Sequence, residues 1–190
     1  DLTSVDFDGI MGVGDLLPEF ASMHPKLRVA NLNNMDVSED ALVKFAANCT
    51  QLEEVSLQPC NFGDVGLIHD DVMIQEVVKH WEHLKSIDAI ACVNSATLDA
   101  MATYCRGLEK IFIAQCSLND EDIIGVATAC KGLKEVILCD VEGISNAAII
   151  GLADKCEHLK VVHLIRVTGI TSAAIDYLLE TRNLTDFDAR

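Results

Sequence analysis

Proline, aromatic residues and long apolar runs are all scarce in this sequence. Only 3 of the 190 residues are proline and 5% are aromatic, whereas 50% are hydrophobic. This composition excludes a disordered chain and suffices for one well-buried domain, which we expect to span residues 1–190. No apolar run reaches the roughly 18 residues of a membrane-spanning helix, and no signal-peptide pattern opens the chain. We therefore expect no membrane interaction, and because the chain starts at Asp1 we expect a fragment of a longer protein.

Positive charge is also scarce. The chain has 14 lysine and arginine residues against 30 aspartate and glutamate residues, which gives a formal net charge of −16. Nucleic-acid binding depends on basic patches, so a nucleic-acid partner is excluded. Two interpretations of the acidic surplus stay open. It selects a protein partner with a basic or apolar docking segment, or it only keeps an apolar-rich domain in solution.

Apolar residues recur with a period of about 25 residues along the whole chain. The unit from Leu108 has Ile111 and Ile113 at strand spacing, followed by Ile123 and Val126 at helical spacing. A strand and a helix this short cannot bury their apolar sides alone, so the units must stack on one another. The pattern predicts eight parallel strands, in units that start near Leu2, Leu27, Leu52, Leu84, Leu108, Leu133, Leu159 and Leu184.

Most units have a helix-capping residue at nearly the same distance after the strand. Such side chains accept hydrogen bonds from the free backbone N–H groups of a helix start. The first helix, near residues 15–23, differs because Pro18 lies in its opening turn and Gly12-Val13-Gly14 precedes it. This G-x-G lacks the further glycine of a nucleotide-binding loop and predicts a turn. The predicted caps are Ser38, Asp70, Asn94, Asn119, Ser145 and Thr171.

The eight cysteines follow the repeat. One group lies three residues before the first leucine of a unit, a position that Trp81 shares, and a second group lies eight residues after it. Reduced cysteine packs as a small apolar residue, so we expect spacers in the core and a reducing, cytoplasmic compartment. The first group is Cys49, Cys105, Cys130 and Cys156, the second is Cys60, Cys92 and Cys116, and Cys139 fits neither.

The spacing Cys130-x-x-Leu133-x-x-Val136-x-Leu138, which recurs from Cys156, resembles the cysteine-containing subfamily of leucine-rich-repeat proteins. The resemblance covers practically the whole chain. It implies an α/β right-handed solenoid, or horseshoe, with a parallel concave sheet of about eight strands and convex helices. Members of this subfamily are best known as the substrate-recognition arrays of F-box ubiquitin ligases. That role is an alternative function for this chain.

Two departures from the repeat bear on function. Seven extra residues, placed near 61–71, are either part of a binding surface or a tolerated loop. The strands at Leu2 and Leu184 leave the two ends of the array open. We expect these ends to be covered by flanking sequence or to support self-association with another chain.

Strand alternation selects the residues of the concave face. If the first, fourth and sixth positions of each strand point inward, the third, fifth and seventh point outward. We therefore predict a non-catalytic module that binds another protein on this face, unless a flanking segment of the same protein covers it. The predicted contact residues are Ile90, Phe112, Ala114, Ile137, Cys139, Val161, His163 and Ile165 in an apolar half, and Asp6, Asp8, Asn31, Asn33 and Asp88 in a polar half.

Catalytic and metal sites are weaker interpretations. A thiol and an imidazole form the minimal nucleophilic device, so Cys139 and His163 define a second alternative, a hydrolase. His80 and His83 have a spacing that suits a metal ligand pair, but their position at a helix end favours interaction with the helix dipole. His69 lies in the insertion. We expect no metal and no cofactor.

Overall fold

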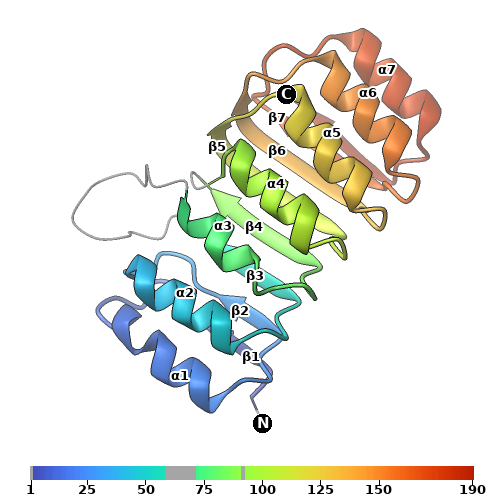
Figure 1. Cartoon of the computed structure of the whole chain (residues 1–190). Helices are drawn as coiled ribbons and strands as arrows, with labels where there is room; N and C mark the ends of the chain where they lie inside the picture. Colours follow the sequence, from blue (N-terminus) through green and yellow to red (C-terminus); the bar gives the residue numbers. More distant parts are fainter. Residues whose placement is uncertain (1, 59–71, 91–92) are drawn as a thin grey trace.

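The computed structural model describes residues 2–58, 72–90 and 93–190 (Figure 1). The described strands form one eight-stranded sheet, in which they lie in the order of the sequence and pair in parallel. The predicted α/β solenoid of eight stacked units is confirmed. The strands are β1 (Ser4–Asp6), β2 (Val29–Asn31), β3 (Glu54–Leu57), β4 (Ser86–Ile90), β5 (Lys110–Ser117), β6 (Glu135–Glu142), β7 (Val161–Ile165) and β8 (Asp186–Ala189).

The helices cover one side of the sheet, and each described helix packs against its neighbour in the sequence (Figure 1). No described helix lies on the other side, which is called the open sheet face below. None of the described helices combines the length and the apolar character needed to cross a bilayer. The helical elements are η1 (Gly14–Leu16), α1 (Leu17–Met23), α2 (Glu39–Asn48), α3 (Val72–Val78), α4 (Ser95–Tyr104), α5 (Asp120–Ala129), α6 (Asn146–Lys155) and α7 (Ser172–Thr181).

The core lies between the sheet and the helices. Equivalent positions of successive units pair across the sheet, as Ile111 does with Val136 and Val136 with Val162. The first leucine is buried in all six inner units, whereas Leu2 in the first unit is 41% exposed. The leucine that starts each inner unit is thus covered by the units on both sides of it.

The helix starts follow the predicted capping pattern, with one exception. Ser38, Asn94, Asn119 and Ser145 each accept a hydrogen bond from a backbone N–H of the first turn. Thr171 holds the cap position of α7 without such a bond, because its hydroxyl instead accepts from the side chain of Asn146, 2.9 Å away. Asp70, like the insertion near 61–71, lies outside the described residues.

In five of the units that the structure describes at this position, one residue in or shortly after the strand has a left-handed backbone conformation. The residue at this position has a φ of 52–56° in the four units where it is not glycine. A left-handed conformation costs a non-glycine residue about 1–2 kcal/mol, so the packing of neighbouring units must impose it. The residues are Gly9, Asn34, Gln115, Asp140 and Arg166.

The Gly12-Val13-Gly14 segment is a turn, as predicted. Gly12 has a φ of +74°. A Cβ atom on Gly14 would lie 1.8 Å from the carbonyl oxygen of Asp36, so only glycine lets the loop of the first unit approach the loop of the second.

Four core cysteines also link successive units. Cys49, Cys105, Cys130 and Cys156 follow the ends of α2, α4, α5 and α6, are fully buried and are free thiols. The Cys105 and Cys130 thiols each donate to a carbonyl oxygen of the preceding unit at 3.5 Å. Burial raises the pKa of Cys105 to about 12 and of the other three thiols to about 11. Cys60 and Cys92 lie outside the described residues.

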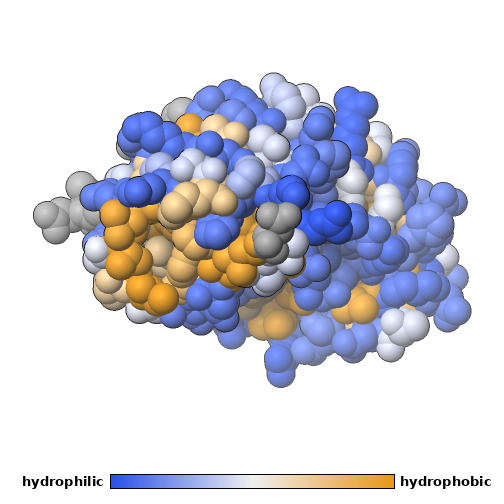
Figure 2. Space-filling model, turned by 90° about the horizontal axis from the view of Figure 1, so that it is seen from below, coloured by the Kyte–Doolittle hydropathy of each residue, from blue (hydrophilic) through white to orange (hydrophobic). Residues whose placement is uncertain are grey.

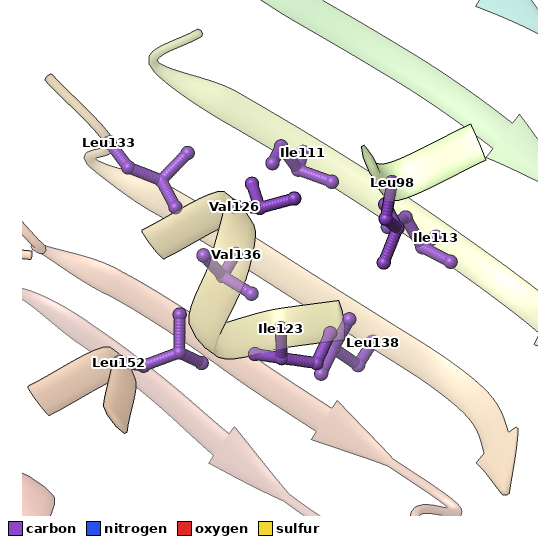
Figure 3. A pocket seen from close by; sticks show the side chains of 9 residues that line it. All are labelled: Leu98, Ile111, Ile113, Ile123, Val126, Leu133, Val136, Leu138 and Leu152. Carbon is purple, nitrogen blue, oxygen red and sulfur yellow. The ribbon is translucent and has the colours of Figure 1, made fainter. Parts of the chain in front are cut away.

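The core around α5 is densely packed. Figure 3 shows nine apolar side chains around a void between α4, α5, α6 and strands β5 and β6. The void has a volume of about 10 Å³. It is lined by apolar side chains and is at the lower limit for a single water molecule, so it serves neither a solvent molecule nor a ligand. The lining residues are Leu98, Ile111, Ile113, Ile123, Val126, Leu133, Val136, Leu138 and Leu152.

We expect Leu133→Ala to lower the free energy of unfolding by about 2–5 kcal/mol, because it removes buried methyl groups and enlarges this void. Urea titration of the wild type and the variant gives the difference. Leu179→Ala is the matched control, since Leu179 is 45% exposed and its truncation should change stability by no more than about 0.5 kcal/mol. Equal losses in the two variants would contradict the assignment of Leu133 to the core.

The buried thiols should make the fold sensitive to alkali. Above the ordinary thiol pKa of 9.0, cysteines in the unfolded chain release their protons, whereas Cys130 in the folded chain keeps its proton up to about pH 11. The unfolded state then binds fewer protons, so stability falls as pH rises, by up to about 1.4 kcal/mol per pH unit for each thiol.

Urea titrations between pH 8 and 11 measure this slope. Cys130→Ala should lower the starting stability but reduce the slope above pH 9, because one titrating thiol is gone. An unchanged slope would mean that Cys130 ionises equally in both states.

Candidate functional site

The open sheet face is built from three rows of outward side chains: two rows take one residue from each strand, and the third takes one residue from, or just after, each of β1 to β7. Inward residues such as Ile111 and Ile113 are buried, while Lys110 and Phe112 between them are half-buried, so the predicted strand faces are confirmed. The rows are Ser4, Val29, Glu54, Ser86, Lys110, Glu135, Val161 and Asp186; Asp6, Asn31, Ser56, Asp88, Phe112, Ile137, His163 and Asp188; and Asp8, Asn33, Gln58, Ile90, Ala114, Cys139 and Ile165.

Six of these side chains form what we call the apolar patch, on β4 to β7. Phe112 and Ile137 pair directly across β5 and β6, and Cys139 pairs with Ile165 across β6 and β7. All six are half-buried by their neighbours on the sheet. The patch consists of Ile90, Phe112, Ile137, Cys139, Val161 and Ile165.

Ala114 lies in the third row, between Ile90 and Cys139, but only 3% of it is exposed. A methyl group is too short to reach past larger neighbours. Ala114 is therefore covered by the side chains around it. The expectation that it contacts a partner is wrong, because almost none of its surface is accessible.

An ion pair and a histidine–carboxylate contact lie beside the apolar patch. Lys110 Nζ lies 2.8 Å from Glu135 Oε1, and His163 Nε2 lies 3.0 Å from Asp186 Oδ2. Surface pairs of this kind contribute little to stability. The charged groups already have partners within the domain. In this region a binding partner would therefore gain most free energy by covering the apolar side chains.

The Arg166 guanidinium forms a two-bond ion pair with the Asp140 carboxylate. Both residues have the left-handed conformation, Asp140 within β6 and Arg166 directly after β7. The Arg166 Nε donates to Asp140 Oδ1 at 2.6 Å, and a second bond runs from Nη2 to Oδ2. This pairing holds the pKa of Asp140 below its usual range. No sequence pattern predicted this pair, because the two residues are 26 positions apart and meet only when the units stack.

In the polar half, the side-chain amide oxygens of the two asparagines accept hydrogen bonds from the backbone of the domain itself. Asn31 Oδ1 accepts from the backbone N–H of Asn33 at 3.1 Å, and Asn33 Oδ1 accepts from that of Gln58 at 2.7 Å. Asp6 and Asp8 are exposed, and their carboxylates accept from Asp8 N–H at 2.9 Å and from Asn34 at 2.8 Å respectively. Asn31 and Asn33 therefore shape the strand ends, and the two carboxylates supply the negative charge.

Asp88 lies at the border between the polar half and the apolar patch, beside Phe112 in the second row. Its Oδ2 accepts a hydrogen bond from Gln58, whereas its Oδ1 is buried and has no partner among the described residues. Burial raises the pKa of Asp88, and the Gln58 bond and the charge of Lys110 only partly offset this effect. Ionised Asp88 is thus held at a cost.

The structure does not unite Cys139 and His163. His163 pairs across the sheet with Ile137 and binds Asp186, while Cys139 contacts Asp140 at 3.6 Å and Arg166 at 3.5 Å. Burial, followed by the charge of Asp140, raises the pKa of the Cys139 thiol and disfavours the thiolate. This geometry gives no support to a nucleophilic pair.

The described residues do not place His80 and His83 in a metal-binding group. His83 Nε2 lies 3.7 Å from Glu82 Oε1 at the turn after α3. Within the part of the chain that the structure describes, no three His, Cys, Asp or Glu side chains are grouped to hold a metal ion. His69 lies outside the described residues.

Comparison with known proteins shows the fold. No family model matches the chain, and no curated protein matches it. Internalin C2 from Listeria monocytogenes aligns with a TM-score of 0.62 and 16% identity, covering 100% of this chain and 71% of its own. Internalin F from the same organism aligns with a TM-score of 0.52 and 12% identity, covering 100% and 61%. The chain has the leucine-rich-repeat fold, as the resemblance predicted.

A yeast complex of Rad7 and Elc1 aligns less well. Its TM-score is 0.49 at 15% identity, over 92% of this chain and 52% of the other. A similarity this low carries no argument about function. The ubiquitin-ligase interpretation stays a prediction.

We expect Asp88→Asn to raise the melting temperature at neutral pH, because the amide keeps an acceptor for Gln58 and removes the buried charge. The pKa of Asp88 is raised on folding, so the wild type loses stability as pH rises above the ordinary value of 3.8. The gain should therefore shrink as pH falls toward that value. Melting curves across this range test it, with Asp176→Asn at an exposed position as the control.

Proposed function

We propose that this domain is a non-catalytic protein-interaction module that binds a partner protein across the apolar patch. The observation that supports this most directly is the patch itself: six half-buried apolar side chains lie on four adjacent strands, β4 to β7, on the face that no described helix covers. Contiguous apolar surface on a soluble domain typically marks an interaction site. Full burial of one large side chain is worth about 1.5–3 kcal/mol, and half-buried residues retain part of this gain.

The chemistry of the surface favours a partner segment that is apolar with a basic flank. Asp6 and Asp8 are exposed beyond the apolar patch on the same face, and the chain has a net charge of −16. Charge of one sign on one partner speeds encounter with the opposite sign on the other and rejects acidic competitors. The apolar patch would thus supply most of the affinity, and the polar half would select by charge.

The free, buried thiols support a reducing compartment such as the cytoplasm, because thiols persist there without forming disulfides. Service as the recognition arm of a ubiquitin ligase is a special case of the same proposal. It requires an adaptor-binding helical domain elsewhere in the full-length protein. The hydrolase alternative has no support in the contacts of Cys139 and His163.

A pull-down with paired variants tests the proposal. Phe112→Thr with Ile137→Thr removes the centre of the apolar patch, and threonine retains the strand preference of both positions. We expect this double variant to lose partners that the wild type captures, as measured by quantitative mass spectrometry. We do not substitute glutamate at these two positions, because Phe112 and Ile137 pair directly and two carboxylates would then face each other across β5 and β6.

Tyr177→Thr with Leu179→Thr on α7 is the matched control, since these residues are 39% and 45% exposed on the helical side. The control should capture the same partners as the wild type. Each captured protein is then purified and its affinity for the three forms is measured. Equal affinity for the wild type and the patch variant would refute the proposal, provided that melting curves show the variant to be folded.

A further inference from the structure

Apolar side chains at the end of the array formed by β1 and α1 belong to the core of the repeat (Figure 2). Phe7 has an inward position of the strand pattern, and Phe20 is equivalent to the fully buried Phe45 of the next unit. This end therefore continues the core between the sheet and the helices. The apolar patch instead uses outward positions, where stacking requires no apolar residue, so the residues at its border can distinguish one partner from another.

Asp88 is a charged residue that a partner on the apolar patch would cover. In the second row of the open sheet face it pairs with Ser56 on one side and with Phe112 on the other. Ile90, two residues further along β4, points to the same face. Two of the six side chains of the patch therefore border this carboxylate, and a segment that covers them also comes over Asp88.

The Asp88 carboxylate is poorly placed to bind a cation of the partner. Its Oδ2 already accepts a hydrogen bond from the side-chain amide of Gln58. Its Oδ1 has almost no accessible surface and has no hydrogen-bond partner among the described residues. A lysine or arginine could reach Oδ1 only by displacing the side chains around it. A partner that covers Asp88 thus adds to the cost of burying this charge without supplying a pair.

The charged groups that face Asp88 offset its burial only in part. On β5, Lys110 lies diagonally across from Asp88 and attracts it, but the Lys110 ammonium is 2.8 Å from Glu135 on β6. On β3, the exposed Glu54 lies diagonally across on the other side and carries the same charge as Asp88. Burial accordingly raises the pKa of Asp88 in the free domain, against the opposing effects of Gln58 and Lys110.

We propose that binding of a partner across the apolar patch is coupled to the uptake of a proton by Asp88, so that affinity for an apolar segment rises as the pH falls. The coupling rests on the proposed function, because it requires a partner on the patch. Covering Phe112 and Ile90 removes the water that remains around the carboxylate, and an ionised carboxylate without a cation is then costly. Protonation removes this charge. At neutral pH, Asp88 therefore makes binding weaker than the apolar side chains alone would give.

The direction of the pH dependence follows from proton binding. A partner that buries Asp88 raises its pKa further, so the complex binds more protons than the free domain does. Affinity then rises as the pH falls through the pKa of the complex, and it levels off below the pKa of the free domain. Each pH unit between these two values strengthens binding by up to about tenfold. A partner that supplied a cation to Asp88 would give the opposite trend.

Fluorescence anisotropy of a rhodamine-labelled synthetic peptide tests the coupling at about pH 7.5 and about pH 5.5. The peptide consists of leucine and phenylalanine followed by arginine, and with blocked ends it has no group that titrates in this range. At the higher pH, Asp88→Asn should bind it roughly tenfold more tightly than the wild type, because the amide carries no charge. At the lower pH the difference should shrink to about threefold or less. Comparing the two forms at each pH cancels the titration of the histidines.

Asp176→Asn is the matched control, since Asp176 is exposed on α7, on the helical side of the sheet. It should bind the peptide as the wild type does at both pH values. Tighter binding by the wild type than by Asp88→Asn would overturn the proposal, because the peptide would then pair a cation with Asp88. Equal binding by these two forms at the higher pH would also overturn it, since the bound peptide would leave Asp88 hydrated.

Phe112→Thr with Ile137→Thr separates the failure of the coupling from the failure of the proposed function. If this double variant loses the peptide while Asp88→Asn binds it as the wild type does, the apolar patch is the binding surface and the coupling is refuted. If the double variant binds as tightly as the wild type, the peptide lies elsewhere, which contradicts both. Melting curves at both pH values establish that each variant is folded.

Discussion

The structure depends on the stacking of each unit against the next. A strand and a helix of this size cannot bury their apolar sides alone, and the contrast between Leu27, with no exposure, and Leu2, with 41%, shows what a neighbour on each side provides. Hydrogen bonds between parallel strands join successive units. Hydrogen bonds donated by thiols, such as that from Cys130 to the Cys105 carbonyl oxygen, join them as well. Stability is then a sum of neighbour contacts, and damage to one interface weakens two units.

Stacking also decides where specificity can reside. Inward positions must fit both neighbours, so their size and polarity are constrained along the whole array. Outward positions are free of this demand, and there the chain departs from its own repeat, because the apolar patch occupies one half of the open sheet face. A partner protein would encounter a surface whose chemistry changes from end to end while the backbone beneath it stays regular.

The strands, their faces and most helix starts could be predicted from the sequence, because leucines at a fixed offset and caps such as Asn119 are local signals. The features that could not be predicted from the sequence depend on contacts between neighbouring units. Ala114 is buried because of the size of side chains on adjacent strands, and the Thr171 hydroxyl accepts a hydrogen bond from Asn146 of the preceding unit instead of capping its own helix. The Arg166–Asp140 ion pair and the Gly14–Asp36 approach join residues more than twenty positions apart, which no local pattern encodes.

The two outermost strands carry aspartates on their open face, and this has a consequence for assembly. If a second molecule continued the sheet beyond β8 in the register that the other strands use, its Asp6 would lie opposite Asp188. Like charges directly opposed on paired strands are destabilising. In this register the two carboxylates would oppose continuation of the sheet from one copy of residues 1–190 into another.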